Sequence, residues 1–334
     1  MERITIIGLG LIGGSIALAI KQSDLRDKVT VTGVARTRDT MQRAKKIGAV
    51  DETDPVPERA VRGARLVIVA SPILTVPTVF EEIAPALEEG TIVTDVASVK
   101  APIAKAARDI LPRHSYFVGG HPMAGKEQAG IDAADATLFR DRPWVISPSV
   151  DAPESAVNTV IGLAQLCGAR PLFMDPHEHD SYVAAISHLP LAVSSALFSV
   201  AFASAAWPEL AGLASSGFRD TTRLASGSPE MAHDIMVTNK DNVLHWIDRL
   251  QEEITRLREV IARGDSKEIA EAFTRPQVER DNFMINGAPR RISGDEMPKF
   301  GLNDLLLGSK VSEMMRKQEE MVRASEKRIE ERRK

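Results

Sequence analysis

A histidine between glycines and a proline is the first candidate for chemistry in this chain. His121 stands in the segment Gly-Gly-His-Pro-Met-Ala-Gly at residues 119–125, where the backbone is restrained and the side chain can project into a crevice. An imidazole titrates near neutral pH and can act as a general acid or base. A single histidine is more often structural, but its position at the end of a predicted strand favours a catalytic acid/base.

Two arginines lie in a stretch of small and polar residues, ASSGFRDTTRLA, at residues 214–225. A guanidinium binds carboxylates and phosphates through paired hydrogen bonds. In an otherwise apolar region, we expect at least one of Arg219 and Arg223 to bind an anion. The alternative is a pair of surface charges, and the residues themselves do not decide which arginine faces inward.

The first twenty residues contain a glycine pattern that could bind a dinucleotide. Overall they resemble a secretory signal, with a charged start and an apolar core. However, each glycine inside a continuous helix costs about 1 kcal/mol, and a second predicted strand follows at residues 29–34. We therefore interpret the segment as a strand, a G-x-G-x-x-G turn and a helix, in which backbone N–H groups contact a pyrophosphate. The residues expected to contact it are Gly8, Gly10, Leu11, Ile12 and Gly13.

The residues after the second predicted strand indicate which cofactor is bound. An NAD site places an acidic residue there, whereas this chain has Arg36, Thr37 and Arg38. An arginine fork pairs with a 2′-phosphate, which predicts NADP, with NAD as the alternative. The arginines could also be solvated loop charges. Ser71 and Pro72 follow the next long strand, where small groups let the nicotinamide ribose approach.

Strand and helix patterns alternate along residues 1–174. Buried apolar strands are predicted at 4–7, 29–34, 66–70, 91–96, 116–120, 144–147 and 171–174, with helices at 39–47, 76–87, 102–110 and 153–166. This alternation predicts an α/β domain of the Rossmann type, with a doubly wound parallel sheet covered on both faces. Ligands in such sheets bind beyond the carboxyl ends of the strands.

Residues 175–285 show helical patterns only and are predicted to form an all-α domain. Asp175, Pro176 and Glu178 predict a helix start. Residues 181–206 predict a helix buried almost all round and kinked at Pro190. His177 and His179 do not share a helix face, so we expect a solvated first turn and no metal site. Residues 242–262 carry an apolar stripe typical of a packing helix, which a dimer could bury.

Composition limits the function classes. The 334 residues carry a net charge of −4, which gives no indication of nucleic-acid binding. The single cysteine, Cys167, excludes an intrachain disulfide and a multi-cysteine metal site. No other apolar run is expected to reach membrane-spanning length, so a cytoplasmic protein without membrane contact is predicted. Residues 286–334 are expected to form a charged tail, partly helical or disordered.

The assembled motifs resemble those of the prephenate and arogenate dehydrogenases of tyrosine biosynthesis. The resemblance covers about residues 1–285 and rests on the glycine turn and on segments 94–100, 119–125, 187–190 and 216–223. The chain is most similar to the NADP-using arogenate dehydrogenases of cyanobacteria and plants. The resemblance implies oxidative decarboxylation of arogenate to tyrosine, of prephenate to 4-hydroxyphenylpyruvate, or of both. It also implies hydride transfer to NADP⁺ and a homodimer formed through the helical domain.

The resemblance also implies residue roles. His121 corresponds to the histidine that accepts the proton of the substrate hydroxyl. Ser98 corresponds to a serine that forms hydrogen bonds with that histidine and with the substrate hydroxyl. Arg223 corresponds to the arginine that binds the ring carboxylate. Ser187 corresponds to a serine near the substrate, with His188 beside it.

Two positions concern specificity. Other members have a second histidine directly after the proline of Ser-His-Leu-Pro, and this chain has Leu191 there. Glu127 could select the side-chain ammonium of arogenate, or it could be a loop charge. The alternative functions are a β-hydroxyacid dehydrogenase or pyrroline carboxylate reductase, and a non-catalytic NADP sensor. A hydroxyacid enzyme would need a lysine early in the helical domain, and residues 175–225 contain none.

Overall fold

The computed structural model describes residues 2–126 and 128–287, which belong to two compact units, residues 1–254 and 255–334. The predictions for Glu127 and for nearly all of the charged tail concern residues outside this described part.

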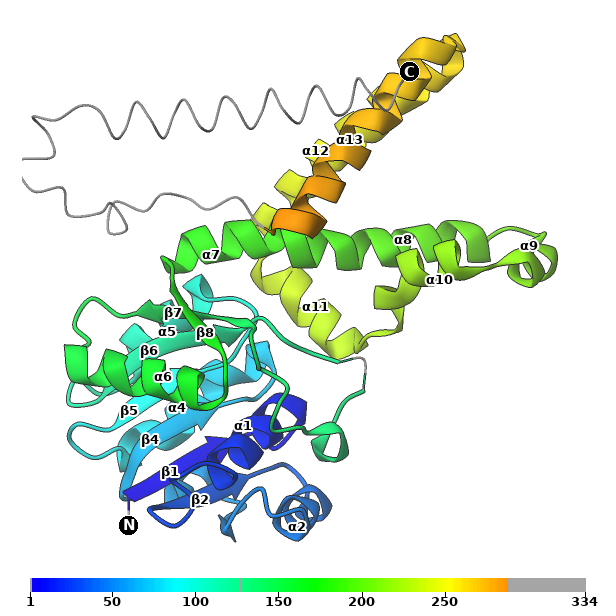
Figure 1. Ribbon diagram of the computed structural model, residues 1–334. Coiled ribbons are helices and arrows are strands. Elements are labelled where there is room, and N and C mark those ends of the chain that lie inside the picture. The colour runs from blue at the N-terminus through cyan, green and yellow to red at the C-terminus, as the bar shows by residue number, and fades with distance from the viewer. Residues whose placement is uncertain (1, 127, 288–334) are drawn as a thin grey trace, which may run out of the picture. The chain divides into compact units, whose positions relative to one another are not determined.

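The first unit contains one eight-stranded sheet, with the strand order β3-β2-β1-β4-β5-β6-β7-β8 (Figure 1). The first six strands in this order are mutually parallel, β7 runs antiparallel to β6, and β8 is parallel to β7. The strands are β1 (Glu2–Ile7), β2 (Val29–Val34), β3 (Glu52–Thr53), β4 (Ala64–Val69), β5 (Ile92–Asp95), β6 (Tyr116–Pro122), β7 (Pro143–Pro148) and β8 (Arg170–Phe173). The predicted Rossmann-type fold is confirmed.

The last two strands correct the expectation of a wholly parallel sheet. A parallel neighbour requires a crossover connection, usually a helix. Among the described residues between β6 and β7 the chain forms a short 3-10 turn, Ile131–Ala133, and no crossover helix, so it returns antiparallel. The reversal places the end of β6 next to the start of β7.

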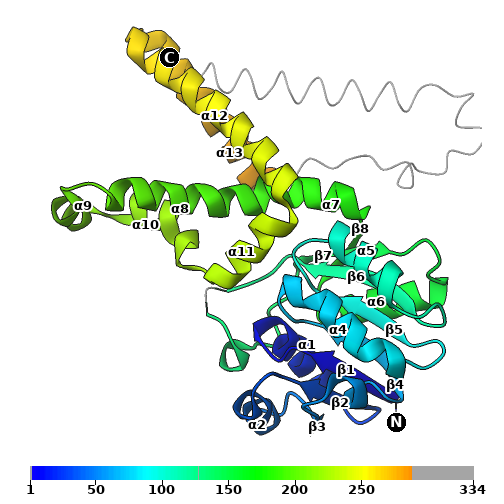
Figure 2. The same cartoon turned by 180° about the vertical axis from the view of Figure 1, so that it is seen from behind.

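Helices cover both faces of the sheet. One face carries α1 (Leu11–Lys21), α2 (Arg38–Lys46) and α6 (Glu154–Leu166), and the other carries α3 (Pro57–Ala60), α4 (Val76–Ile83) and α5 (Ala101–Ile110). Figure 1 shows the first face and Figure 2 the second. Because successive strand residues point to opposite faces, Leu66 and Ile68 of β4 join one core, and Val67 and Val69 join the other.

A helical region completes the first unit. Its elements are α7 (Pro176–Val183), a π-helical turn (Ala184–His188), α8 (Leu189–Phe202), α9 (Trp207–Leu213), α10 (Ser216–Thr222), a 3-10 turn (Arg223–Ser226), α11 (Pro229–Thr238) and the start of α12 (Lys240–Arg263). The predicted helix start is confirmed, because Asp175 accepts hydrogen bonds from the backbone N–H groups of His177 (2.8 Å) and Glu178 (3.2 Å).

Pro190, where a kink was expected, lies within the continuous helix Pro176–Phe202. Proline lacks an N–H and its ring crowds the carbonyl four residues earlier. Here the π-helical turn directly before α8 widens the backbone, which accommodates the ring without ending the helix. The turn carries Ser187 and His188.

The apolar helix is also far less buried than predicted. Within α8 only Ser194 is buried, while Val200 is 76% exposed and Phe202 60% exposed. The continuous helix Pro176–Phe202 has 27 residues and a mean hydropathy of 1.7 in its most apolar window. The expectation that no later apolar run reaches membrane-spanning length was therefore wrong. The same length and composition suit a helix that packs between two protein chains.

The second unit begins within α12 and contains α13 (Ser266–Asn286). Asp265 caps α13, and Arg263 forms an ion pair with Glu268 across the turn between the helices (2.7 Å). The apolar stripe predicted for residues 242–262 is largely exposed within the chain, with Ile254 and Ile261 both more than half exposed.

Candidate active site

His121 lies inside β6, which is two residues longer than predicted. It pairs with Val145 of β7, and its side chain is 9% exposed. The preceding Gly120 lets the end of β5 approach closely, because a Cβ at this position would lie 2.7 Å from the carbonyl oxygen of Asp95. The backbone N–H of Gly120 in turn donates to the Asp95 carboxylate (3.2 Å). The β5 and β6 ends therefore fix the position of His121.

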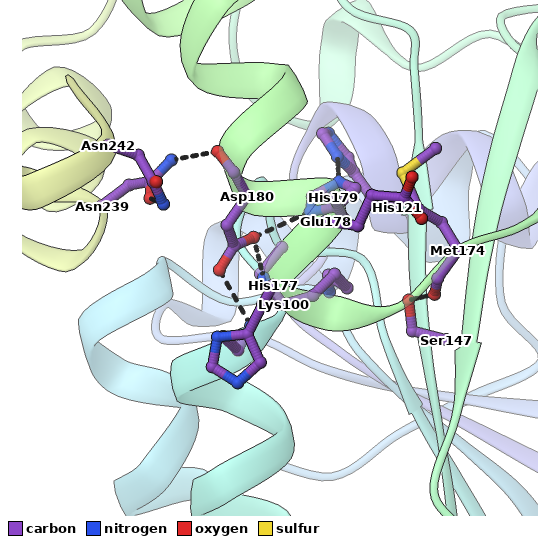
Figure 3. A network of polar contacts seen from close by, with 12 residues as sticks. Lys100, His121, Ser147, Met174, His177, Glu178, His179, Asp180, Asn239 and Asn242 are labelled. Atoms are coloured by element: carbon purple, nitrogen blue, oxygen red, sulfur yellow. Dashed lines mark hydrogen bonds and ion pairs between the residues drawn. The ribbon is translucent and has the colours of Figure 1, made fainter. Parts of the chain in front are cut away.

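A chain of hydrogen bonds links His121 to α7. Its Nδ1 lies 2.8 Å from Nε2 of His179, and Nδ1 of His179 lies 2.8 Å from the Asp180 carboxylate. The same carboxylate accepts the backbone N–H groups of Lys100 (2.7 Å) and Ala101 (2.9 Å) at the start of α5. Figure 3 shows Asp180 between Asn239 on one side and His179 and His121 on the other.

The position of His179 corrects the expectation of a solvated first turn. His179 is fully buried, whereas His177 is exposed as expected. The error arose because the partners of His179 come from β6 and α5, which the spacing within α7 does not reveal. The directly adjacent aspartate was the only local indication. Among the described residues no cluster suited to a metal ion was found.

A buried ion pair lies beside His121. Lys100 Nζ contacts the Asp95 carboxylate, and both side chains are at most 1% exposed. The Asp95 carboxylate also accepts the backbone N–H of Ala97 (2.9 Å). Burial lowers the pKa of Lys100, and the carboxylate partly offsets this effect.

The surroundings of His121 keep its imidazole neutral at pH 7. Burial lowers the pKa of His121 well below its ordinary value, and the neighbouring His179 and Lys100 lower it further. A neutral imidazole has a free lone pair on one ring nitrogen. The site can therefore accept a proton from a bound hydroxyl.

His188 is a second fully buried imidazole in the same network. Its Nδ1 accepts a hydrogen bond from the Asn239 side-chain amide (3.1 Å), which also donates to the backbone oxygen of Asp180 (2.8 Å). The amide orientation is supported by Asn242, which donates to the Asn239 oxygen (2.8 Å). Burial lowers the pKa of His188 to about 4, so the ring is neutral and carries its proton on Nε2. This Nε2 has no partner among the described residues.

The glycine turn fits the pyrophosphate of a dinucleotide. Gly8 has a φ of +105° and no room for a Cβ, which would collide with the carbonyl of Ala70. A Cβ at Gly10 would meet nothing within 4 Å, so the space in front of the α1 N-terminus is open. The buried hydroxyl of Ser71, at the neighbouring end of β4, has no partner in the described chain. An open helix N-terminus and an unpaired hydroxyl suit a bound nucleotide.

The segment after β2 is exposed, as a site for a 2′-phosphate requires. Arg36 and Arg38 form no ion pair with any described residue. The Thr37 hydroxyl accepts the backbone N–H of Thr40 (3.2 Å) and so caps α2. Thr37 therefore has a structural task in addition to the predicted phosphate contact. Pro72, which follows β4, is partly buried and leads into the turn before α4.

The remaining predicted residues lie elsewhere in the first unit. Ser98 is half-buried, and no hydrogen bond joins it to His121. Ser187 is exposed in the π-helical turn, and Arg219 and Arg223 have exposed side chains on α10 and the following 3-10 turn. That 3-10 turn packs on α8, where the N–H of Ala225 donates to Ser194 (3.1 Å). Leu191, partly buried, packs against the core beneath α4 and α5.

Comparison with known proteins identifies both parts of the chain. The profile described as "Prephenate dehydrogenase, nucleotide-binding domain" matches residues 16–172, and "Prephenate dehydrogenase, dimerization domain" matches residues 175–275. The chain is 34% identical to prephenate dehydrogenase of Bacillus subtilis over 286 residues, which cover 85% of this chain and 76% of that protein. It is 32% identical to cyclohexadienyl dehydrogenase of Zymomonas mobilis, covering 84% and 95% of the two chains.

Two solved structures are similar over nearly their whole length. One is prephenate dehydrogenase from A. aeolicus in complex with hydroxyphenyl propionate and NAD⁺, with a TM-score of 0.78, 28% identity, and coverage of 85% of this chain and 98% of that one. The other is Synechocystis arogenate dehydrogenase, with a TM-score of 0.71, 31% identity, and coverage of 84% and 100%.

Proposed function

Because this chain belongs to the prephenate dehydrogenase family of NAD(P)-dependent decarboxylating oxidoreductases, we propose that it converts arogenate to tyrosine with NADP⁺ and also accepts prephenate. The observation that carries this proposal is the buried, neutral His121 at the carboxyl edge of the sheet. The similarity to an arogenate dehydrogenase supports arogenate, and Arg36 and Arg38 support NADP⁺.

The proposed chemistry uses one proton acceptor and one anion site. When bound, the nicotinamide supplies the acceptor for the hydride of the carbon that carries the ring hydroxyl. His121 Nε2 takes the hydroxyl proton, with Ser98 as a second hydrogen-bond partner of the hydroxyl. The bond to the ring carboxylate then breaks, its electron pair enters the ring, and CO₂ leaves. His121 returns its proton to the phenolate oxygen, so the imidazole ends neutral.

Substrate binding is assigned to the helical region. Arg223 binds the ring carboxylate, and the Nε2–H of His188 and the hydroxyl of Ser187 bind other polar groups of the substrate. Glu127 remains a candidate for selecting the ammonium of arogenate. The unpaired Nε2 of His188 supports this assignment, because a buried donor without a partner is costly unless a ligand satisfies it.

Substituting Arg223 with alanine should mainly raise the KM for the substrate, since the carboxylate loses its partner before and during the reaction. The loss of one charge-assisted contact corresponds to an increase in KM of about 10- to 100-fold. Steady-state kinetics measure it, with Arg219→Ala as the matched control. If Arg219→Ala raises KM and Arg223→Ala does not, the carboxylate site belongs to Arg219.

Substituting Arg36 with serine should shift the ratio of kcat/KM for NADP⁺ to that for NAD⁺ toward NAD⁺. The guanidinium can pair with the 2′-phosphate, which NAD⁺ lacks, so NADP⁺ should lose roughly 10-fold or more and NAD⁺ little. Arg26→Ser, which removes an exposed arginine from the turn before β2, is the control. An unchanged ratio in Arg36→Ser would contradict the assignment.

The decisive experiment combines two substrates with two cofactors. Purified protein is incubated with arogenate or prephenate and with NADP⁺ or NAD⁺, and reduced cofactor and CO₂ are measured together. We expect equal amounts of both products, with the highest kcat/KM for arogenate and NADP⁺. Cofactor binding without turnover of either substrate would favour the sensor hypothesis instead.

We further propose that the enzyme is a soluble cytoplasmic homodimer that pairs through the helical domain. The matching dimerisation-domain profile and the exposed apolar side chains of α8 and α9 support this, with Leu213 83% exposed and Val200 76% exposed. Light scattering should give about twice the 36.3 kDa of one chain. A monomer mass, or extraction only with detergent, would contradict the proposal.

A further inference from the structure

The two histidines and the aspartate that join β6 to α7 form a directed hydrogen-bond chain. From the geometry we propose that His179 and Asp180 are positioning residues that hold His121 in the tautomer with a proton on Nδ1 and a lone pair on Nε2. This inference rests on the proposed role of His121 as proton acceptor. Neither His179 nor Asp180 needs to touch the substrate for it to hold.

The direction of the chain follows from what each atom can donate. The Asp180 carboxylate already accepts two backbone N–H groups of the α5 start, so it is an acceptor toward His179 as well. The Nδ1 of His179 must therefore carry a proton, and in the tautomer with its single proton on Nδ1 the Nε2 of His179 is an acceptor. The partner 2.8 Å away, Nδ1 of His121, must then donate.

The consequence is a defined base at the other end of His121. A neutral imidazole with a proton on Nδ1 has its lone pair on Nε2. A free imidazole exchanges between two tautomers, and one of them has no acceptor at Nε2. The chain removes the unproductive tautomer before the substrate binds, which is the role that a buried carboxylate plays behind a catalytic histidine in other enzymes.

The anchor of the chain is rigid, which a positioning role requires. His179 is fully buried and Asp180 is 3% exposed. Asp180 is held by the N-terminal N–H groups of α5 through its side chain, and its backbone oxygen accepts the amide of Asn239, which also orients His188. One residue thus fixes the orientation of both imidazoles.

The first test reads the tautomer directly in the wild-type protein. ¹⁵N-histidine NMR distinguishes a protonated from an unprotonated ring nitrogen, and the His121→Asn variant assigns the His121 signals. We expect Nδ1 of His121 to be protonated and Nε2 to be unprotonated at pH 7. Protonation on Nε2 instead would overturn the proposal, whatever the enzyme assays show.

The second test uses His179→Phe, which keeps a ring of similar size and removes both hydrogen bonds. We expect kcat to fall by about one to three decades, the KM for NADP⁺ to stay unchanged, and His121 to populate the Nε2–H tautomer. His179→Gln should recover part of kcat, because its amide oxygen can still accept the His121 proton. The matched control is His177→Gln on the exposed side of the same helix, which should retain wild-type kinetics.

A double variant separates positioning from packing. If His179 acts only through His121, then His179→Phe combined with His121→Asn should be no slower than His121→Asn alone. If the kcat of the double variant is lower than that of His121→Asn by the full factor that His179→Phe causes alone, the proposal is overturned. Failure of the proposed function is distinguishable, because wild-type protein would then turn over neither substrate while the His121 tautomer is still measurable.

Discussion

Replacing His121 with asparagine is expected to lower kcat by about two to four decades, the usual contribution of general acid–base catalysis. Asparagine keeps a polar side chain of smaller size but cannot accept a proton at neutral pH. The variant should fold, since β6 is held by backbone pairing with β5 and β7. Stopped-flow or steady-state assays with arogenate measure the change.

The control for this variant is His177→Asn, which makes the same substitution at an exposed histidine. It should leave kcat unchanged. In the wild-type protein, the acid limb of kcat/KM should lie well below pH 6.5, because burial lowers the pKa of His121. Wild-type rates in His121→Asn would remove this residue from the mechanism.

Replacing Lys100 with methionine should reduce the free energy of unfolding by about 3–5 kcal/mol, since the Asp95 carboxylate is left buried without its counter-charge. For a unit of this size that corresponds to a Tm lower by roughly 10 °C. The variant should also raise the pKa of His121, because the charge of Lys100 contributes to holding it down. Thermal unfolding and the pH dependence of kcat/KM measure the two effects.

The matched control is Lys105→Met, which removes a lysine whose ion pair with Asp109 is exposed on α5. It should leave the free energy of unfolding nearly unchanged, since exposed pairs contribute little. Combining Lys100→Met with Asp95→Asn removes both buried charges and should restore part of the lost stability. Equal destabilisation by Lys100→Met and Lys105→Met would contradict the prediction that removing Lys100 leaves a costly unpaired charge in the core.

The local patterns of the sequence were sufficient for most of the fold of residues 1–174. Alternating strand and helix signals and the glycine turn are local in the chain, and they form the predicted Rossmann-type sheet. The reversal at β7 was not predicted, because strand direction depends on the connection from β6 and not on the composition of the strand. The domain boundaries themselves, 174/175 and 285/286, stay predictions.

The candidate site also contains some residues that the sequence identified and others that only the structure revealed. By itself the sequence singled out His121, the pair Arg219 and Arg223, and the glycines, because their residue types and neighbours carry a chemical meaning at short range. It could not identify His179 or Asn239 as partners of the two buried imidazoles. His179 lies 58 residues from His121, and Asn239 lies 51 residues from His188. Only tertiary packing brings these side chains within hydrogen-bond distance. The hydrogen bonds that result decide which ring nitrogen of each buried imidazole carries the proton.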